Sequence, residues 1–379
     1  MNFYSNFLLF VIVLITIYLL YRLFVQRYKI FELNTTNKNA FIENFDMNKN
    51  YKDSIVTNLA LYNKSNLTIN SFIFKSMDYA DESAFELRNF CIKSSYCSVF
   101  NGLDCTIDML YYVLSRGCRF IDLELYYDYD KKPESVLVGY SNDYLIPSTS
   151  NSLDLSDVFD EINKNAFTAM SPNNNDPLFI QLRLKHIPTN LTDPEQIKSR
   201  LQYIYDLIAG SAKAKLSLLY GNAPINAKTS IQTLQRQIVL IMDSSYNNRD
   251  YSSISPNLKK IINFDCPSSD IKKRNSSDLV EEKLKISSDG ITTDSGYLRQ
   301  IVPTVTENEF EYHLKDNLDG LAMLTKYSAN MCPMQFWVNG PQLQAYENIF
   351  NTGRNGVLPI AHTLSYSQQQ SINPTIIYP

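Results

Sequence analysis

The stretch Leu110–Tyr127 reads LYYVLSRGCRFIDLELYY and carries the most informative pattern in the chain. An amphipathic segment ends at Gly117, and an apolar strand follows that carries two acids, Asp122 and Glu124. Side chains along a strand alternate between its two faces, so both acids project from the same face. Burying two like charges is costly without a cation nearby. The sequence therefore predicts a metal ion or a basic side chain opposite the two acids.

The RGCRFIDLEL part of this stretch resembles the X-region of phosphoinositide-specific phospholipases C. In that family, R-G-C-R precedes a barrel strand whose two acids bind calcium. Leu87–Gly102 and Asp176–His186 are similar to neighbouring X-region strands, while Tyr297–Pro303 and Glu347–Ile360 resemble pieces of the Y-region. The matches follow the order found in the family. They imply an α/β fold, a phospholipase C-like (β/α)8 TIM barrel.

The alternation of strand and helix patterns also indicates an α/β fold with parallel pairing. Strands are predicted at 135–141, 177–184, 237–243 and 332–339. Helices are predicted to begin near Asp104, near Leu155 and at Asp193-Pro194. A closed barrel would place functional side chains at the carboxyl ends of its strands. An open doubly wound sheet is the alternative, but the chain has no glycine-rich phosphate loop to support it.

The expected domain organisation is one membrane anchor followed by one large domain. The expected segments are an anchor at 1–29, a polar spacer at 30–69, a barrel at 70–362 and a polar tail at 363–379. Within the barrel, the resemblance implies an X-like half at 87–243, a linker at 244–280 and a Y-like half at 281–362.

Phe7–Val25 forms an apolar run with one charge, Arg22, and is long enough to cross a bilayer. A cleaved signal peptide would have a basic start and a small-residue cleavage site, which are both missing. A buried core helix is the bland alternative. Arg22, Arg27 and Lys29 follow the run or end it, so the positive-inside rule places the C-terminal domain in the cytosol. The sequence therefore predicts a single-pass membrane protein with its N-terminus outside.

Composition excludes several classes of function. The net charge of −4 leaves no basic footprint, which argues against nucleic-acid binding. Six cysteines form no CxxC pair and there are only three histidines, so a structural zinc site is not expected. Most of the cysteines are expected to be buried free thiols in a reducing compartment. His186, His313 and His362 have no Ser or Cys partner at a known catalytic spacing.

The resemblance also implies where catalytic residues should stand, and this chain has lost them. The family's two catalytic histidines fall on Tyr96 and Val138, and its calcium-ligand asparagine falls on Cys97. Its last calcium-ligand glutamate falls on Arg183, or on Leu184 in the other register. A phenol that titrates near pH ~10 does not replace an imidazole at neutral pH. We therefore expect no catalytic residues, no calcium site and no other cofactor.

The substrate-binding positions implied by the resemblance have also changed. The family's phosphate-binding lysines correspond to Ile241 and Asp243, and its arginine and tyrosine correspond to Gln300 and Val302. 

Only the acid pair remains, and strand periodicity places Arg183 and Lys185 on one face as well. We expect Asp122, Glu124, Arg183 and Lys185 to form a salt-bridge cluster, a vestige of the metal site. The alternative is that Arg183 and Lys185 simply face solvent.

Three functions follow from these observations. The first is a catalytically inactive, membrane-anchored phospholipase C-like barrel that acts as a structural or interaction module. The second is an active phosphodiesterase with a rearranged metal site made by Asp122, Glu124 and His186. The third is a non-catalytic receptor for a lipid or inositol phosphate, which would need a basic pocket. Calcium binding would separate the second from the first.

The source and partners are predicted from the style of the sequence. Its abundance of Asn, Ile, Lys and Tyr is typical of an AT-rich genome, and the usual companion domains of the family were not recognised. These features favour a large DNA virus, in which the protein would lie in the internal membrane of the virion. Its expected partners are that membrane, bound through Phe7–Val25, and capsid or other virion proteins.

Overall fold

The structure is a computed structural model, and all residues that it describes belong to the compact unit Ser65–Pro379. It describes residues 86–372 except 103, 129–133, 141–150, 169–170, 172, 186–192, 222–224, 244–250, 277–284, 288–289, 293–296, 303–316, 339 and 354. The expected anchor and spacer lie outside the described residues. In the part that is described, no helix is both long and apolar enough to span a membrane.

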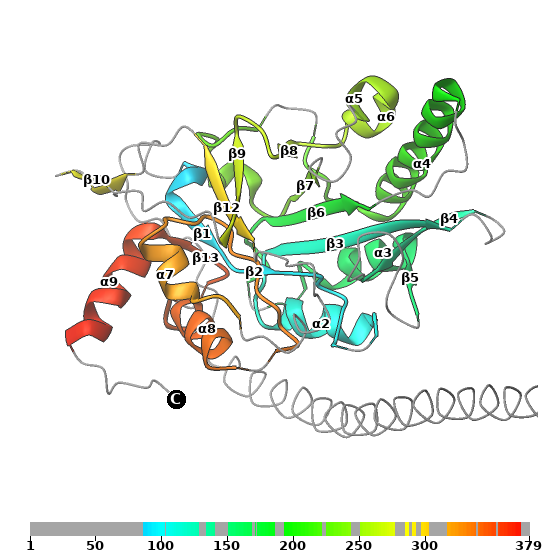
Figure 1. Ribbon diagram of the computed structural model, residues 1–379. Coiled ribbons are helices and arrows are strands. Elements are labelled where there is room, and N and C mark those ends of the chain that lie inside the picture. Colours follow the sequence, from blue (N-terminus) through cyan, green and yellow to red (C-terminus); the bar gives the residue numbers. More distant parts are fainter. Residues whose placement is uncertain are drawn as a thin grey trace, which may run out of the picture. The chain divides into compact units, whose positions relative to one another are not determined.

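The central sheet is a run of parallel strands that are buried on both faces. Its parallel strands, in spatial order, are β2 (Ser94–Ser95), β3 (Phe120–Asp128), β6 (Leu178–Leu184), β7 (Ile238–Asp243) and β8 (Phe264–Cys266) (Figure 1). Every residue of β6 and β7 is buried. This explains why their sequences are nearly continuous apolar runs rather than alternating ones.

Helices that connect these strands begin at recognisable caps. Three helices lie along the sheet, namely α2 (Ile107–Ser115), α3 (Leu155–Asn165) and α4 (Pro194–Lys215) (Figure 1). Asp193 caps α4 and Pro194 occupies its first turn, as predicted. The predicted cap of α2 was wrong, because the Thr106 side chain, rather than Asp104, accepts the Met109 N–H. Both residues are good caps two positions apart, so the sequence does not separate them.

The expectation of parallel pairing fails at several strands, first of all beside β3. Strand β4 (Ser135–Gly139) runs antiparallel to β3, and β5 (Leu153–Asp154) runs antiparallel to β4. A parallel partner would need a crossover of about a dozen residues or more. The connection between Asp128 and Ser135 is much shorter than this, so β3 and β4 form a hairpin.

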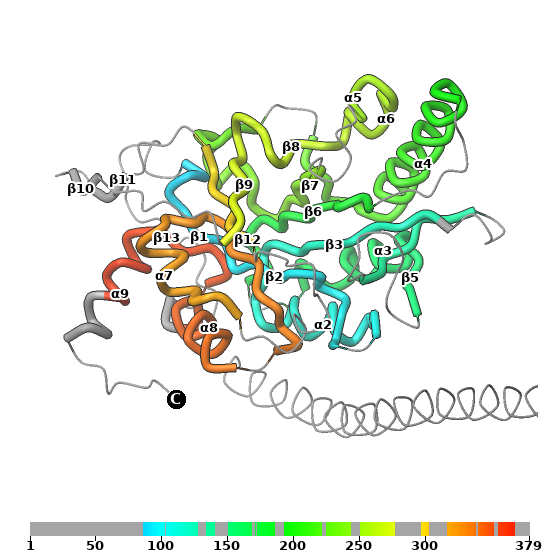
Figure 2. The backbone as a smooth tube through the Cα atoms, viewed as in Figure 1, coloured from blue at the N-terminus to red at the C-terminus, as the bar shows by residue number. Residues whose placement is uncertain are grey.

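The C-terminal part of the domain pairs with the first strand of the N-terminal part. Strand β1 (Phe90–Ile92) pairs antiparallel with β13 (Val357–Pro359), and β9 (Ile271–Asn275) pairs parallel with β12 (Leu298–Val302). Figure 2 shows the blue and cyan β1–β2 segment beside the orange and red C-terminal part. The remaining elements are the 3-10 turns Leu87–Asn89 and Ile231–Leu234, α5 (Tyr251–Ile254), α6 (Pro256–Lys259), β10 (Lys285–Ser287), β11 (Gly290–Thr292), α7 (Gly320–Thr325), α8 (Pro341–Gly353) and α9 (Ile360–Ile372).

These elements differ from the predicted organisation in three places. The segment 244–280, expected as a linker, contains α5, α6, β8 and β9, and α9 extends into the expected tail. The strand predicted at 332–339 is reduced to bridges, in which Met331 joins Ile92 and Gln300 while Met334 joins Ser95. Among the described residues the strands therefore form separate sheets linked by bridges, and not the continuous closed barrel that was expected.

The apolar core packs against the parallel strands on the face that carries Phe120, Phe179 and Val239. It is built from inward-facing residues of both halves, which include Phe90, Ile92, Phe120, Phe179, Val239, Ile241, Phe264, Ile271, Leu298, Met331 and Val357. All six cysteines are buried free thiols, which agrees with the prediction for most of them.

Candidate functional site

The register of the parallel strands places rows of polar side chains next to the apolar core. Residues paired across parallel strands project to the same side, and positions two apart share a face. The lowest row holds Phe120, Phe179 and Val239; the middle row holds Asp122, Gln181, Ile241 and Phe264; the upper row holds Glu124, Arg183, Asp243 and Cys266. The side of the sheet that bears the acid pair therefore changes from apolar to charged toward the carboxyl ends of its strands.

Arg183 of β6 is bound to both acids of β3. Its Nε lies 2.6 Å from Asp122 Oδ1 and its Nη2 lies 2.7 Å from Asp122 Oδ2, which is a two-pronged contact. The same Nη2 lies 3.1 Å from Glu124 Oε2. All three side chains are almost completely buried, at 1–2% exposure. A planar guanidinium matches a carboxylate in this way and keeps its charge at any physiological pH.

The turn after β2 closes the lower side of the cluster. The Cys97 N–H donates to Asp122 Oδ2 over 2.9 Å, from a residue with a φ of +41°. The Arg183 guanidinium lies over the Tyr96 ring, 4.7 Å from its centroid, and its Nη2 lies 3.0 Å from Cys97 Sγ. Burial raises the pKa of the Cys97 thiol well above its usual value, although Arg183 opposes this. Cys97 is therefore a protonated thiol rather than a nucleophile.

Lys185 and Tyr126 also bind the second acid, Lys185 at the oxygen that Arg183 contacts and Tyr126 at the other oxygen. Lys185 Nζ lies 3.5 Å from Glu124 Oε2, and the Tyr126 hydroxyl donates to Glu124 Oε1. Burial lowers the pKa of Lys185, and the Glu124 carboxylate partly offsets that effect. The structure thus brings together Asp122, Glu124, Arg183 and Lys185, the four residues of the predicted cluster.

A second polar network occupies the neighbouring strands. Lys273 of β9 lies 2.6 Å from Asp243 Oδ2, and Gln181 Nε2 donates to the same oxygen over 2.9 Å. Gln300 of β12 donates to Gln181 Oε1 over 2.6 Å and accepts a 2.8 Å contact from the Cys266 thiol. Asp243 and Gln300 are positions where the resemblance implied phosphate-binding residues. Here both side chains bind Gln181 instead, and Asp243 also binds Lys273 while Gln300 also binds Cys266.

The two networks balance their charges. Three buried acids, Asp122, Glu124 and Asp243, face the cations of Arg183, Lys185 and Lys273. This donor set does not fit a calcium ion, because both oxygens of Asp122 and both oxygens of Glu124 are already engaged. In the described part of the chain, no group of three or more His, Cys, Asp or Glu residues could hold a metal ion.

Some predicted positions do not join the cluster. Val138 pairs with Leu125, so it lies on the face of the sheet opposite Asp122 and Glu124. His186 lies outside the described residues. Ile241 belongs to the apolar core, and Val302 is also buried.

The sequence did not reveal an aromatic group beside the cluster. Phe100 stacks on Tyr140 at 4.0 Å with an interplanar angle of 5°, and its ring lies 4.9 Å from that of Trp337. Trp337 is also 6.4 Å from Tyr96, whose ring contacts Arg183. The three segments are far apart in the sequence, so no local pattern could have predicted the group. Trp337 is buried, which agrees with the expectation of a core residue.

The R-G-C-R motif has a structural task at the opposite end of β3. Arg116 binds Glu347 of α8 through Nε at 2.7 Å and through Nη2, while Lys93 Nζ lies 3.2 Å from the same carboxylate. Gly117 adopts a φ of +79°, a conformation that favours glycine. The buried Arg119 donates to the carbonyl oxygens of Ala166 and Asn173. The motif therefore ties β3 to α8 and to the loop before β6.

A buried carboxyl beside this motif predicts a pH-dependent stability. Asp176 is 3% exposed, and its Oδ2 has no hydrogen-bond partner in the described part of the chain. Burial raises the pKa of Asp176 from 3.8 to about 7, although Arg119 and the Gly356 N–H oppose it. A folded-state pKa above the unfolded one means that stability is full below 3.8 and is lost as the pH rises through about 7.

We therefore expect Asp176→Asn to remove part of this loss. The unfolding free energy of the variant minus that of wild type should increase by roughly 2–4 kcal/mol as the pH rises from ~4 to ~8. Chemical denaturation at both pH values measures the change, with the exposed Asp157→Asn as a control that should change little. A wild type and an Asp176→Asn variant with parallel pH profiles would contradict the assignment.

Comparison with solved structures shows which known fold the domain resembles. No family model matches the sequence, and no curated protein matches it. The crystal structure of S. officinalis PLC21 superposes with a TM-score of 0.50 at 13% identity, over 72% of this chain and 37% of that chain. The described domain has a phospholipase C-like α/β fold. At this identity the likeness concerns the fold alone, and this chain spans 37% of the length of that protein.

Two further structures show weaker similarity. L. pealei PLC21 gives a TM-score of 0.46 at 12% identity, over 72% of this chain and 37% of that chain. A calcium-dependent phosphoinositol-specific phospholipase C from a Pseudomonas species gives 0.40 at 11% identity, over 74% of this chain and 97% of that chain.

Proposed function

We propose that this chain is a catalytically inactive phospholipase C-like domain that serves as a structural or interaction module. The observation that carries the proposal is the contact of Arg183 with Asp122 and Glu124. A cation that is part of the protein takes the place where the resemblance implies a calcium ion. A guanidinium cannot coordinate the oxygens of a substrate phosphate as a metal ion does. The site therefore lacks a Lewis acid, while the scaffold remains folded.

The groups around the cluster support this proposal. Cleaving a phosphodiester by internal attack requires a general base, a general acid and a cation at the phosphoryl oxygens. Tyr96 lies against Arg183, Val138 faces the other side of the sheet, and the pKa of Cys97 is raised by burial. None of these three side chains supplies a proton donor or acceptor that works near neutral pH.

The proposal extends to the architecture and location of the protein. The parallel strands of both halves, linked by the bridges at Met331 and Met334, support an eight-stranded barrel in which this segment is the last strand. The apolar run Phe7–Val25 supports a single-pass anchor with a cytosolic domain. We further propose that the protein lies in the internal membrane of a virion and contacts capsid proteins. Loss of membrane retention after alkaline extraction would exclude the anchor.

Hydrolysis of phosphatidylinositol tests the proposed inactivity. We expect the full-length chain, with calcium and vesicles that contain phosphatidylinositol, to release no more product than an Asp122→Asn/Glu124→Gln variant. Equal background rates, with and without a calcium chelator, are the expected result. Calcium-dependent release that disappears in the double variant would overturn the proposal in favour of a rearranged metal site. A bound inositol phosphate without turnover would instead favour a receptor, which the pairing of Lys273 with Asp243 argues against.

A further inference from the structure

Three consecutive basic residues on β9 project in alternating directions. Lys273 faces the interior, where its Nζ lies 2.6 Å from Asp243 Oδ2. Lys272 and Arg274, one residue to either side, project from the opposite face of the strand. Arg274 is exposed and Lys272 is partly exposed, and neither makes an ion pair in the described part of the chain. Two of the three cations therefore carry their charge on the outer face of the domain.

The neighbouring strand adds a third cation to the same face. Figure 2 shows β9 and β12 side by side, and Arg299 of β12 is the register partner of Lys272. Both side chains lie over the ring of Tyr297, with Lys272 Nζ at 3.7 Å and Arg299 Cζ at 5.5 Å from its centroid. The negative face of an aromatic ring attracts cations, so Tyr297 holds these two side chains in place. We call Lys272, Arg274 and Arg299 the basic strip.

The basic strip concentrates like charge in a small area. Register partners on neighbouring strands lie ~4.8 Å apart, and Arg274 lies about 7 Å further along β9 than Lys272. Like charges that lie opposite each other on paired strands lower the stability of a sheet. Asp270 shares this face of β9 and makes no ion pair with the strip. Three cations and one acid leave an excess of two positive charges, which a bound anion would neutralise.

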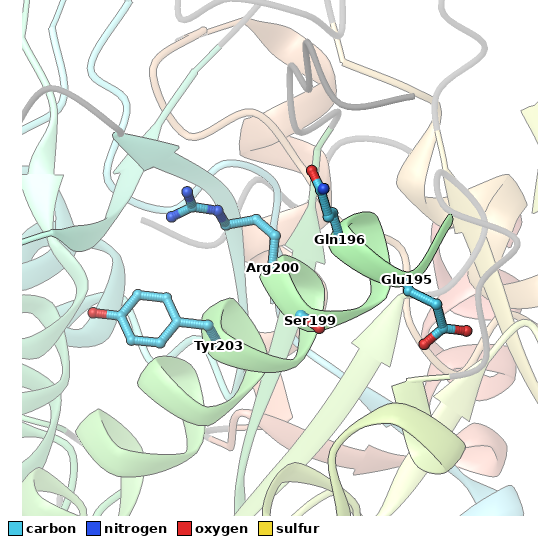
Figure 3. Close-up of a pocket in the computed structure, with 5 residues that line it drawn as sticks. All are labelled: Glu195, Gln196, Ser199, Arg200 and Tyr203. Carbon is cyan, nitrogen blue, oxygen red and sulfur yellow. The ribbon is translucent and has the colours of Figure 1, made fainter. Parts of the chain in front are cut away.

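Other partly exposed cations of the domain are neutralised by acids of their own. Figure 3 shows Arg200 in the groove along α4, and its Nη1 lies 3.3 Å from Glu134 Oε2. Arg88 likewise pairs with Glu86. The strip differs from these pairs because the fold brings its cations together and orders two of them on one ring. Side chains that are ordered in advance lose less conformational entropy when a ligand binds.

We propose that the basic strip binds a phosphate monoester group. Such a group carries a charge close to −2 and three acceptor oxygens, which match the excess charge and the three cations of the strip. Guanidinium groups bind phosphate through paired N–H donors, and a lysine adds a compact charge with three further donors. A carboxylate, with one charge and two oxygens, would leave part of the strip unneutralised.

The strip shares no residue with the buried cluster, so the inference goes beyond the proposed function and does not depend on the loss of catalysis. The same group occurs at the end of some lipid headgroups and on soluble esters. The experiment below separates these two sources.

Isothermal titration of glycerol phosphate into the full-length chain, in a zwitterionic detergent, tests the inference. We expect saturable binding that weakens at least about fivefold in Lys272→Gln and in Arg274→Gln. Arg200→Gln is the matched control, because it removes one positive charge from a paired arginine outside the strip, and it should bind like wild type. Tyr297→Leu keeps every charge but no longer orders Lys272 and Arg299, and should weaken binding about threefold.

The same titration in mixed micelles that contain phosphatidic acid identifies the source of the group. A lower apparent affinity for glycerol phosphate would show that the lipid headgroup occupies the strip, and an unchanged affinity would assign the strip to a soluble ester. Both results support a phosphate site.

Three outcomes would overturn the inference. One is the absence of saturable binding to wild type at roughly 10 mM glycerol phosphate, which corresponds to an affinity too weak for a specific site. Another is an affinity that neither Lys272→Gln nor Arg274→Gln changes. The third is equal weakening in Arg200→Gln and Arg274→Gln, which would show a diffuse attraction to positive charge.

Discussion

Arg183→Met is expected to lower the unfolding free energy of the domain by about 3–5 kcal/mol. The substitution keeps much of the side-chain volume but leaves Asp122 and Glu124 buried with a single cation, Lys185. The loss reflects uncompensated charge rather than a missing contact, because a buried ion pair by itself adds little to stability. Urea denaturation of wild type and variant measures the difference.

Two further variants separate this cause from a general loss of packing. Arg200→Met removes a partly exposed arginine from its pair with Glu134, and should cost less than ~1 kcal/mol. Asp122→Leu added to Arg183→Met removes the stranded carboxylate, and should recover a large part of the loss. If Arg183→Met were as mild as Arg200→Met, Arg183 would not be buried against the acids.

Glu347→Leu is expected to be comparably damaging, by about 3–5 kcal/mol, at the opposite end of the strands. It strands Lys93, which is 1% exposed, and removes the partner of Arg116. Burial raises the pKa of Glu347, but Lys93 and Arg116 outweigh this and hold it below 4.5. A lowered folded-state pKa gives stability that is complete above 4.5 and is lost as the pH falls through the folded value.

The pH dependence distinguishes this account from a simple packing defect. The gap between wild type and Glu347→Leu should be constant from pH ~7 to ~5 and should shrink only in stronger acid. Thermal melting at several pH values measures the gap, and the exposed Glu195→Leu serves as a control that should shift the midpoint far less. A gap that stays constant into strong acid would show that the Glu347 charge is not responsible.

The central contacts of the site could be predicted from the sequence because they depend on strand periodicity. Asp122 and Glu124, like Arg183 and Lys185, are two residues apart on apolar strands, so each pair shares a face. The need to neutralise two buried acids then selects the basic pair as their partner. Strand periodicity and charge pairing are local properties, and neither depends on the loops.

Other features could not be predicted because they depend on long-range geometry. Hydrophobic patterns do not encode strand direction, so the strand at 135–141 was predicted but its antiparallel pairing with β3 was not. Lys273 lies in a polar segment whose composition indicated a linker, yet β9 pairs with β12 and places Lys273 on Asp243. Tyr96 and Cys97 were identified only as lost catalytic positions, whereas they form one wall of the cluster.

Under the proposed function, the cluster also explains how the site could lose its metal while the fold persisted. Removing the metal alone would leave two buried carboxylates unpaired, which is strongly unfavourable. One basic residue on the neighbouring strand corrects that imbalance at the same position. The phospholipase C-like scaffold is then held by charges that belong to the chain itself.

Calorimetric titration of calcium into the full-length chain tests this account most directly. We predict no saturable heat for the wild type, and the same trace for Asp122→Asn, because Arg183 already occupies the acids. Stoichiometric calcium binding that is lost in Asp122→Asn would contradict the account and show that the metal site is intact.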